Sequence, residues 1–95
     1  MLERLTNRMT FRERVTFTEL IKNKGQAVTR QRLAEVALMK NFNPAFDRSV
    51  DIRVSRIRKH LVNNDSNHKI LPVWGKGYVL IDGDSAGEKN LLAAS

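Results

Sequence analysis

The spacing of apolar residues between positions 44 and 63 constrains the fold of this chain more than any other feature. These residues recur four, three and four positions apart: Val50, Val54, Ile57 and Leu61. That periodicity predicts an amphipathic helix with a single buried stripe. Asn43 suits the N-cap and Pro44 the first turn. We therefore expect the helix to span residues 44–63, after which a loop-forming segment ends it.

The opposite face of this helix is basic. At about 100° per residue, it collects Ser49, Ile52, Arg56, Lys59 and Asn63, with Arg53 at its edge and Arg48 and Arg58 beside the stripe. In a DNA major groove, guanidinium groups can chelate guanine and an exposed isoleucine can meet a thymine methyl group. A solvated charged face would carry much the same basic residues, so this helix by itself leaves both interpretations open.

A shorter helix precedes it near the N-terminus. Thr10 and Glu13 have the spacing of a capping box, in which each side chain satisfies a free backbone N–H group. Gly25 follows as a stop signal. We therefore expect a helix over residues 11–23.

A second short helix and a hairpin complete the set of predicted elements. After a brief extended segment at residues 27–28, Thr29 caps a helix that continues to about Met39. Beyond the long helix, residues 69–73 and 78–81 are rich in apolar and β-branched residues and flank a glycine-containing turn. Three helices followed by a hairpin predict an α+β, mainly α fold of the winged helix-turn-helix type. In that fold the long helix enters the major groove and the hairpin reaches the neighbouring backbone or minor groove.

Composition narrows the class of function. The chain of 95 residues is short for two domains, and its 17 Lys and Arg against 10 Asp and Glu give a net charge of +7, which favours a polyanionic partner. It has no cysteine, so disulfides, thiolate zinc sites and cysteine nucleophiles are excluded. Its apolar runs are too short to span a bilayer, so we expect no membrane association. We expect one domain over residues 1–81 and a flexible acidic tail over residues 82–95.

No catalytic or metal-binding constellation stands out. His60, His68 and Asp65 match no standard spacing of metal ligands and are better explained as helix-end and loop residues. The short Gly75-Lys76-Gly77 segment lacks the long loop and following helix of a phosphate-binding motif. We expect a binding protein that is not an enzyme and that needs neither a metal nor another cofactor.

Two segments and their spacing are distinctive. The first is Arg48-Ser-Val-Asp-Ile-Arg-Val-Ser-Arg-Ile-Arg-Lys-His-Leu61 and the second is Val73-Trp-Gly-Lys-Gly-Tyr78; the residues from Met9 to Leu33 fit the same pattern upstream. Over residues 9–81 the chain resembles the C-terminal DNA-binding effector domain of OmpR/PhoB-type bacterial response regulators. The resemblance implies a cytoplasmic regulator of transcription in a two-component system. It also implies binding to double-stranded DNA, typically as a homodimer on tandem half-sites, with a receiver domain in the full-length protein.

The resemblance also assigns residues. Carried over position by position, it implies base contacts from Ser49, Ile52, Arg53 and Arg56. It implies phosphate contacts from Thr29, Arg30, Arg32, Arg48, Arg58 and Lys59, and wing contacts from Trp74 and Lys76. Trp74 occupies a position where some relatives carry a minor-groove arginine, and we expect Trp74 and Tyr78 to pack the hairpin on the long helix.

Three further expectations remain open. Only about nine residues precede the first helix, so the N-terminal sheet of the family should be reduced or absent. The loop over residues 38–46 corresponds to a segment that can contact RNA polymerase in the family, although Phe42 and Phe46 are better explained as folding back on the core. The main alternative is a winged-helix protein-interaction module with only non-specific affinity for nucleic acid. An RNA-binding module and a nuclease are disfavoured, because the chain has few aromatic residues for stacking and no acidic pair suited to a catalytic metal.

Overall fold

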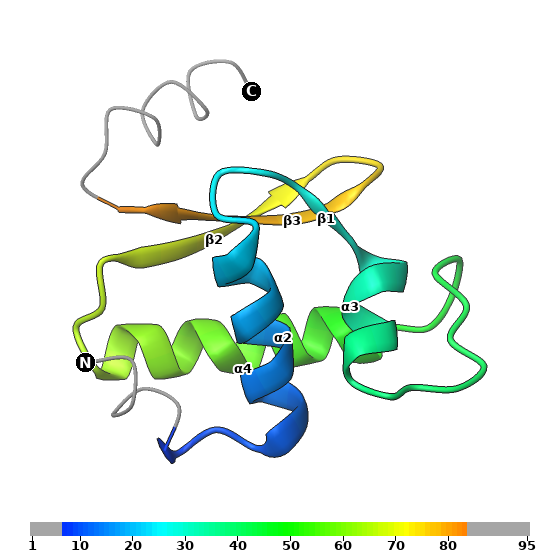
Figure 1. Cartoon of the computed structure of the whole chain (residues 1–95), viewed down its shortest axis with the longest axis horizontal. Coiled ribbons are helices and arrows are strands. Elements are labelled where there is room, and N and C mark those ends of the chain that lie inside the picture. Colours follow the sequence, from blue (N-terminus) through cyan, green and yellow to red (C-terminus); the bar gives the residue numbers. More distant parts are fainter. Residues whose placement is uncertain (1–6, 84–95) are drawn as a thin grey trace.

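Three helices lie on one side of a small antiparallel sheet (Figure 1). The computed structural model describes residues 7–83, so most of the segment before the first helix, where we expect a reduced or absent N-terminal sheet, and most of the expected acidic tail lie outside the described residues. The elements, in chain order, are α2 (Phe11–Lys22), β1 (Val28–Thr29), α3 (Arg30–Val36), α4 (Ser49–Asn63), β2 (His68–Val73) and β3 (Gly77–Asp82). This is the predicted order of three helices and a C-terminal hairpin. Strand β3 extends to Asp82, one residue into the segment expected to be a tail.

The sheet has a third strand that the sequence did not predict. The β2–β3 hairpin is joined by β1 on the other side of β3, which gives the order β1-β3-β2. Strand β1 is only two residues long and pairs Val28 with Tyr78 and Thr29 with Gly77. A Cβ atom on Gly77 would collide with the Val28 carbonyl oxygen, so this pairing requires glycine there. The two-residue strand therefore depends on close backbone approach rather than on a recognisable strand pattern.

The boundaries of α2 and α3 follow their caps. The capping box of α2 is confirmed: the Thr10 amide donates to Glu13 Oε1 over 3.0 Å, and the Glu13 amide donates to Thr10 Oγ1 over 3.2 Å. Thr29 caps α3 as predicted, since its hydroxyl accepts from the Arg32 amide. However, α3 ends at Val36 instead of about Met39, because Leu38 adopts a left-handed conformation with φ of 57° that cannot continue a helix.

The long helix begins later than predicted. Residues 44–46 form a turn, residues 47–48 are irregular, and α4 starts at Ser49. Asn43 does organise this turn, because its side-chain oxygen accepts from the Ala45 amide. Asp47 then accepts from the Ser49 amide over 2.9 Å and satisfies a free N–H group at the start of α4. The Asn43-Pro44 signal is real but begins a turn, and the helix itself follows Asp47.

The predicted stripe forms the centre of the core. Val50, Val54 and Ile57 are fully buried, together with residues from α2, α3 and β3: Phe17, Leu20, Leu33, Ala34 and Leu80. Leu61 is also buried. The α4 stripe thus packs against both other helices and β2, and its opposite side is left outside the core.

Two aromatic residues do not lie where the sequence predicted. Phe42 packs against the core as expected, whereas Phe46 is 73% exposed. Tyr78 packs towards α4 as expected, but Trp74 is 98% exposed at the hairpin turn. Gly75, with φ of 72°, turns the chain directly after Trp74. The indole therefore projects away from the protein rather than joining the hairpin to the helix.

Candidate nucleic-acid interface

The outward face of α4 is the first part of the candidate interface. Its central residue Ile52 is 51% exposed, and Arg56 and Lys59 are exposed beside it. Ser49 at the helix start is partly exposed, and the side chain of Arg48 is largely exposed to solvent. The periodicity of the sequence thus places these residues correctly. Together they present a hydroxyl, an aliphatic side chain and several cations on one helix face.

Arg53 lies deeper than predicted. It is only 9% exposed, and its Nη1 atom lies 3.2 Å from the sulfur of Met39. Burial, and secondly the neighbouring Arg12 cation, lower the pKa of Arg53 below its ordinary value. Met39 and the start of α2 lie beside Arg53, so the edge position expected from the helical repeat is mostly covered by neighbouring segments. Periodicity within one helix could not indicate this cover.

A hollow of about 600 Å³ lies between α4 and the start of α2. It is lined by Ser49, Ile52, Arg53 and Arg56 from α4 and by residues 10–13, which are the N-cap and first turn of α2. Arg12 is exposed there and adds a cation that the sequence reasoning did not select. The first turn of α2 therefore lies beside the exposed face of α4.

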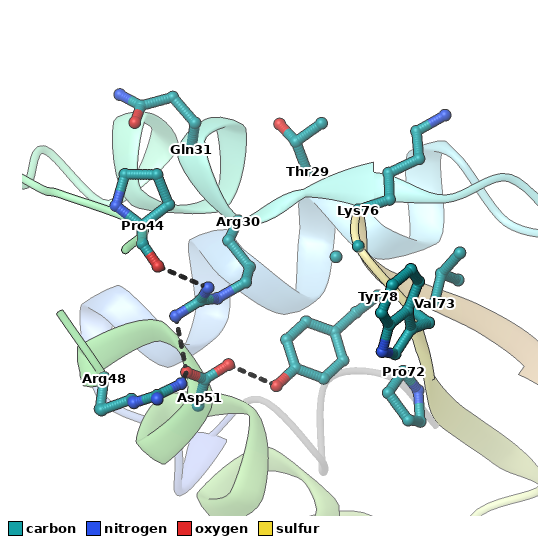
Figure 2. A pocket seen from close by; sticks show the side chains of 13 residues that line it. Thr29, Arg30, Gln31, Pro44, Arg48, Asp51, Pro72, Val73, Lys76 and Tyr78 are labelled. Carbon is teal, nitrogen blue, oxygen red and sulfur yellow. Dashed lines mark hydrogen bonds and ion pairs between the residues drawn. The ribbon is translucent and has the colours of Figure 1, made fainter. Parts of the chain in front are cut away.

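The hairpin turn forms the second part of the candidate interface. Lys76 is exposed, and Trp74 projects beside it. A second hollow, of about 490 Å³, separates this turn from the starts of α3 and α4, and Figure 2 shows its lining residues. Thr29, Gln31 and Arg48 line its opposite side. Cationic and hydroxyl groups thus surround a space between the wing and the helix-turn-helix.

Arg30 is bound within the protein. Its Nη1 donates to the Pro44 carbonyl oxygen over 2.8 Å, and its Nη2 donates to Asp51 Oδ2 over 2.8 Å (Figure 2). The same Nη2 also donates to the Asp47 carbonyl oxygen over 3.0 Å. The guanidinium also lies 6.0 Å from the centre of the Phe42 ring. These contacts attach the start of α3 to the α3–α4 loop. The expected phosphate contact would have to compete with three internal hydrogen bonds.

Arg58 is also used internally. Its Nε and Nη2 atoms both donate to the Ile70 carbonyl oxygen, over 2.9 and 2.8 Å, and its guanidinium lies 5.6 Å from the centre of the Tyr78 ring. The family resemblance implies phosphate contacts from both Arg30 and Arg58. In the fold those same positions face neighbouring elements, and the guanidinium groups join them.

Asp51 and Tyr78 were missed as functional candidates. The Tyr78 hydroxyl donates to Asp51 Oδ1 over 2.6 Å, while the other carboxylate oxygen pairs with Arg30. Burial, followed by the hydrogen bond to Asp51, raises the pKa of Tyr78 to about 12. One signal in the sequence could have indicated this: Asp51 is the single acid among the basic residues of the long helix.

The remaining predicted phosphate ligands differ in availability. Thr29 is exposed, although its hydroxyl already caps α3. Arg32 is half exposed and pairs with Glu19 over 3.2 Å and with Glu35 over 3.8 Å. Such exposed pairs are weak and exchange readily, so Arg32 remains able to turn towards a phosphate. Arg48 pairs with Asp51 only at 3.8 Å.

The histidines take part in separate pairs. His60 Nε2 lies 3.2 Å from Glu13 Oε1 and His68 Nδ1 lies 3.5 Å from Asp82 Oδ1. Within residues 7–83, no three His, Cys, Asp or Glu side chains gather as a metal site would require. In the same residues, no helix has the length and apolar character needed to cross a membrane.

Two known proteins are similar to this chain. A curated relative, the transcriptional regulatory protein CpxR homolog of Haemophilus influenzae, is 37% identical over 67 residues, which cover 65% of this chain and 27% of that protein. The chain thus spans about a quarter of the length of that relative. Among solved structures, the RstA DNA-binding domain of Klebsiella pneumoniae, crystallised in complex with the RstA box, is similar with a TM-score of 0.63 and 31% identity. That match covers 77% of this chain and 72% of the other.

The similarity to the RstA domain identifies the three helices and three-stranded sheet as a winged helix. A family model described as "Transcriptional regulatory protein, C terminal" matches residues 6–80, which include every described helix and nearly all of the sheet. The chain belongs to this family of C-terminal domains of transcriptional regulatory proteins, as its resemblance to OmpR/PhoB-type effector domains predicted.

Proposed function

We propose that this chain binds double-stranded DNA sequence-specifically, as the effector domain of a two-component response regulator that acts in the cytoplasm. Helix α4 lies in the major groove, and the β2–β3 wing lies on the adjacent backbone or minor groove. The observation that carries the proposal is the outward face of α4, where Ile52 and Arg56 are exposed while the stripe behind them is fully buried. The similar RstA domain, whose structure contains its DNA box, supports the same assignment.

The residue roles follow from exposure and reach. Ser49, Ile52 and Arg56 are the proposed base contacts, because a hydroxyl, an aliphatic group and a guanidinium can distinguish base pairs in the major groove. Arg53 can contact a base only if its guanidinium leaves the sulfur atom of Met39. Arg48 and Lys59 are proposed phosphate contacts on α4. The proposed contacts of Thr29, Arg32, Trp74 and Lys76 come from α3 and the wing.

Arg30 and Arg58 have a different proposed role. Their guanidinium groups are already hydrogen bonded to backbone carbonyls and, for Arg30, to Asp51. Each guanidinium can approach DNA only if it breaks these hydrogen bonds. Loss of a hydrogen bond from a charged donor costs about 1.5–3 kcal/mol of free energy. We therefore propose that both arginines orient the DNA-binding elements, and that any phosphate contact they make is secondary.

The proposed partners beyond DNA follow from the family and from the α3–α4 loop. A receiver domain precedes this domain in the full-length regulator, and two copies bind tandem half-sites. Leu38 and Phe46 are exposed on the loop, beside Lys40. This mixed apolar and cationic surface is a candidate for contact with RNA polymerase.

Selection of bound duplexes from a random pool tests the proposed function. A consensus made of two tandem half-sites about 10–11 bp apart is the expected result for a dimer with one α4 per groove. Equal binding to selected and scrambled duplexes at physiological salt would instead support the protein-interaction module with non-specific affinity. Such equality would reject sequence-specific recognition by α4.

Two substitutions then test the residue roles on the selected duplex. Arg56→Ala should weaken binding by about 1–3 kcal/mol and relax the preference at one base position. Lys59→Ala should weaken all duplexes alike and reduce the salt dependence by about one phosphate contact. Lys22→Ala, an exposed cation at the end of α2, is the matched control and should change binding little.

A further inference from the structure

The wing turn itself is attached to the helices by few contacts. Trp74, Gly75 and Lys76 are exposed, and in the part of the chain that the structure describes no side-chain hydrogen bond joins these three residues to a helix. Strand β1 pairs with only two residues of β3, Gly77 and Tyr78. The position of the turn relative to α4 must therefore depend on the residues just behind it.

Tyr78 is the side chain that reaches from the base of the wing to α4. It is buried, and its hydroxyl donates a 2.6 Å hydrogen bond to Asp51 Oδ1 (Figure 2). The bond is short because the acceptor is charged, and bonds of that kind are about twice as strong as neutral ones. The guanidinium of Arg58, itself bonded to the β2 backbone, lies against the same ring. The phenol is thus held at its tip and on its face.

Asp51 connects the wing to the rest of the interface. One of its oxygens accepts from Tyr78, and the other accepts from Arg30 over 2.8 Å. Arg30 in turn donates to the Pro44 and Asp47 carbonyl oxygens. A single carboxylate on α4 therefore contacts β3 on one side and the first residue of α3 on the other, and that residue holds the α3–α4 connection. Asp51 lies only one residue from the exposed Ile52, on the helix that carries the proposed base contacts.

We propose that Asp51 is a positioning residue: through its hydrogen bond to Tyr78 it fixes the wing relative to the DNA-binding face of α4. This inference rests on the proposed function. With the bond intact, Lys76 and α4 contact the same duplex at once. Without it, the wing remains folded but moves relative to α4, and the contribution of Lys76 to affinity is lost while that of α4 is retained.

A double-mutant cycle between Tyr78→Phe and Lys76→Ala tests the inference. Phe keeps the ring and removes only the hydroxyl. One phosphate contact raises the affinity about 8-fold when the salt concentration falls from 1 M to 0.1 M. If the contact contributes nothing at 1 M, its loss should therefore lower the affinity about 8-fold at 0.1 M salt. We expect Lys76→Ala to have about this effect in the wild-type background and less than about a twofold effect in the Tyr78→Phe background.

Lys59→Ala is the matched control for the cycle. Lys59 lies on α4 and is exposed, so its removal should weaken binding equally in both backgrounds. A general loss of folded protein would reduce binding in all variants alike, and circular dichroism would detect it. Equal effects of Lys76→Ala in the two backgrounds would overturn the inference. So would the absence of any effect in the wild type, because the wing would then contribute nothing that needs positioning.

Trp74 supplies an independent measurement, since it is the single tryptophan of the chain. Saturating duplex should quench its emission in the wild type and quench it less than half as much in Tyr78→Phe. Identical quenching would show that the wing reaches DNA without the hydroxyl, and would overturn the inference. Failure of the proposed function itself has a different result, namely that the wild-type protein shows no preference for any duplex.

Discussion

The substitution Arg58→Ala distinguishes a structural role of this residue from the phosphate contact that the family resemblance implies. The guanidinium donates twice to the Ile70 carbonyl oxygen and lies over the Tyr78 ring. Hydrogen bonds from a charged donor contribute about 1.5–3 kcal/mol, and a cation–π contact at a partly exposed site adds about 0.5–1 kcal/mol. Because Arg58 is only partly buried, we take the lower end and expect a loss of about 2 kcal/mol.

The assay is thermal unfolding followed by circular dichroism. For a domain of this size, about 2 kcal/mol corresponds to a decrease in Tm of about 8–16 °C. Lys59→Ala, the neighbouring cation on the exposed side of the same helix, is the control. It should change stability by no more than about 0.5 kcal/mol, and it should reduce the salt dependence of DNA binding, which Arg58→Ala should leave nearly unchanged when the protein is folded.

The reverse pattern of stability and salt dependence would assign Arg58 to DNA contact. If Arg58→Ala unfolded within a few degrees of Lys59→Ala and also removed about one phosphate contact from the salt dependence, Arg58 would be a phosphate ligand. Its hydrogen bonds to Ile70 would then contribute little to the packing of β2 on α4.

Three further predictions concern the fold. Gly77→Ala should lower Tm by more than about 8 °C, because its Cβ would meet the Val28 carbonyl oxygen; an unchanged Tm would mean that β1 does not approach β3 so closely. Tyr78, the single tyrosine, should ionise near pH 12 in an ultraviolet titration. Because the pKa of Tyr78 is raised in the folded state, its contribution to the free energy of unfolding is complete below pH 10. That contribution should fall by up to about 2–3 kcal/mol as the pH rises towards 12. A titration midpoint near pH 10 would contradict the buried hydrogen bond. Thr10→Ala, which removes the side-chain cap of α2, should cost about 0.5–2 kcal/mol in urea unfolding, whereas exposed Thr18→Ala on the same helix should cost less; equal costs would argue against the cap.

Local patterns in the sequence predicted most of the architecture. The capping box of Thr10 and Glu13, the cap at Thr29 and the hairpin were all placed within one or two residues. Each depends on residues that are close together in the chain. The predicted boundaries were wrong where the backbone conformation or a contact between distant residues determined the structure. The left-handed conformation of Leu38 ends α3 early, and a two-residue strand pairs with β3 at Gly77.

The amino-acid sequence by itself determined that α4 has one buried and one exposed face, because a helical repeat fixes the direction of every side chain relative to its own helix axis. Only the tertiary structure decided which arginines remain on the exposed face. Arg56 stays exposed, whereas Arg53 is covered beside Met39 and Arg58 bonds to β2. A guanidinium on a long side chain can bind a carbonyl, a carboxylate or a phosphate with similar geometry, so its partner depends on which neighbours the fold brings within reach.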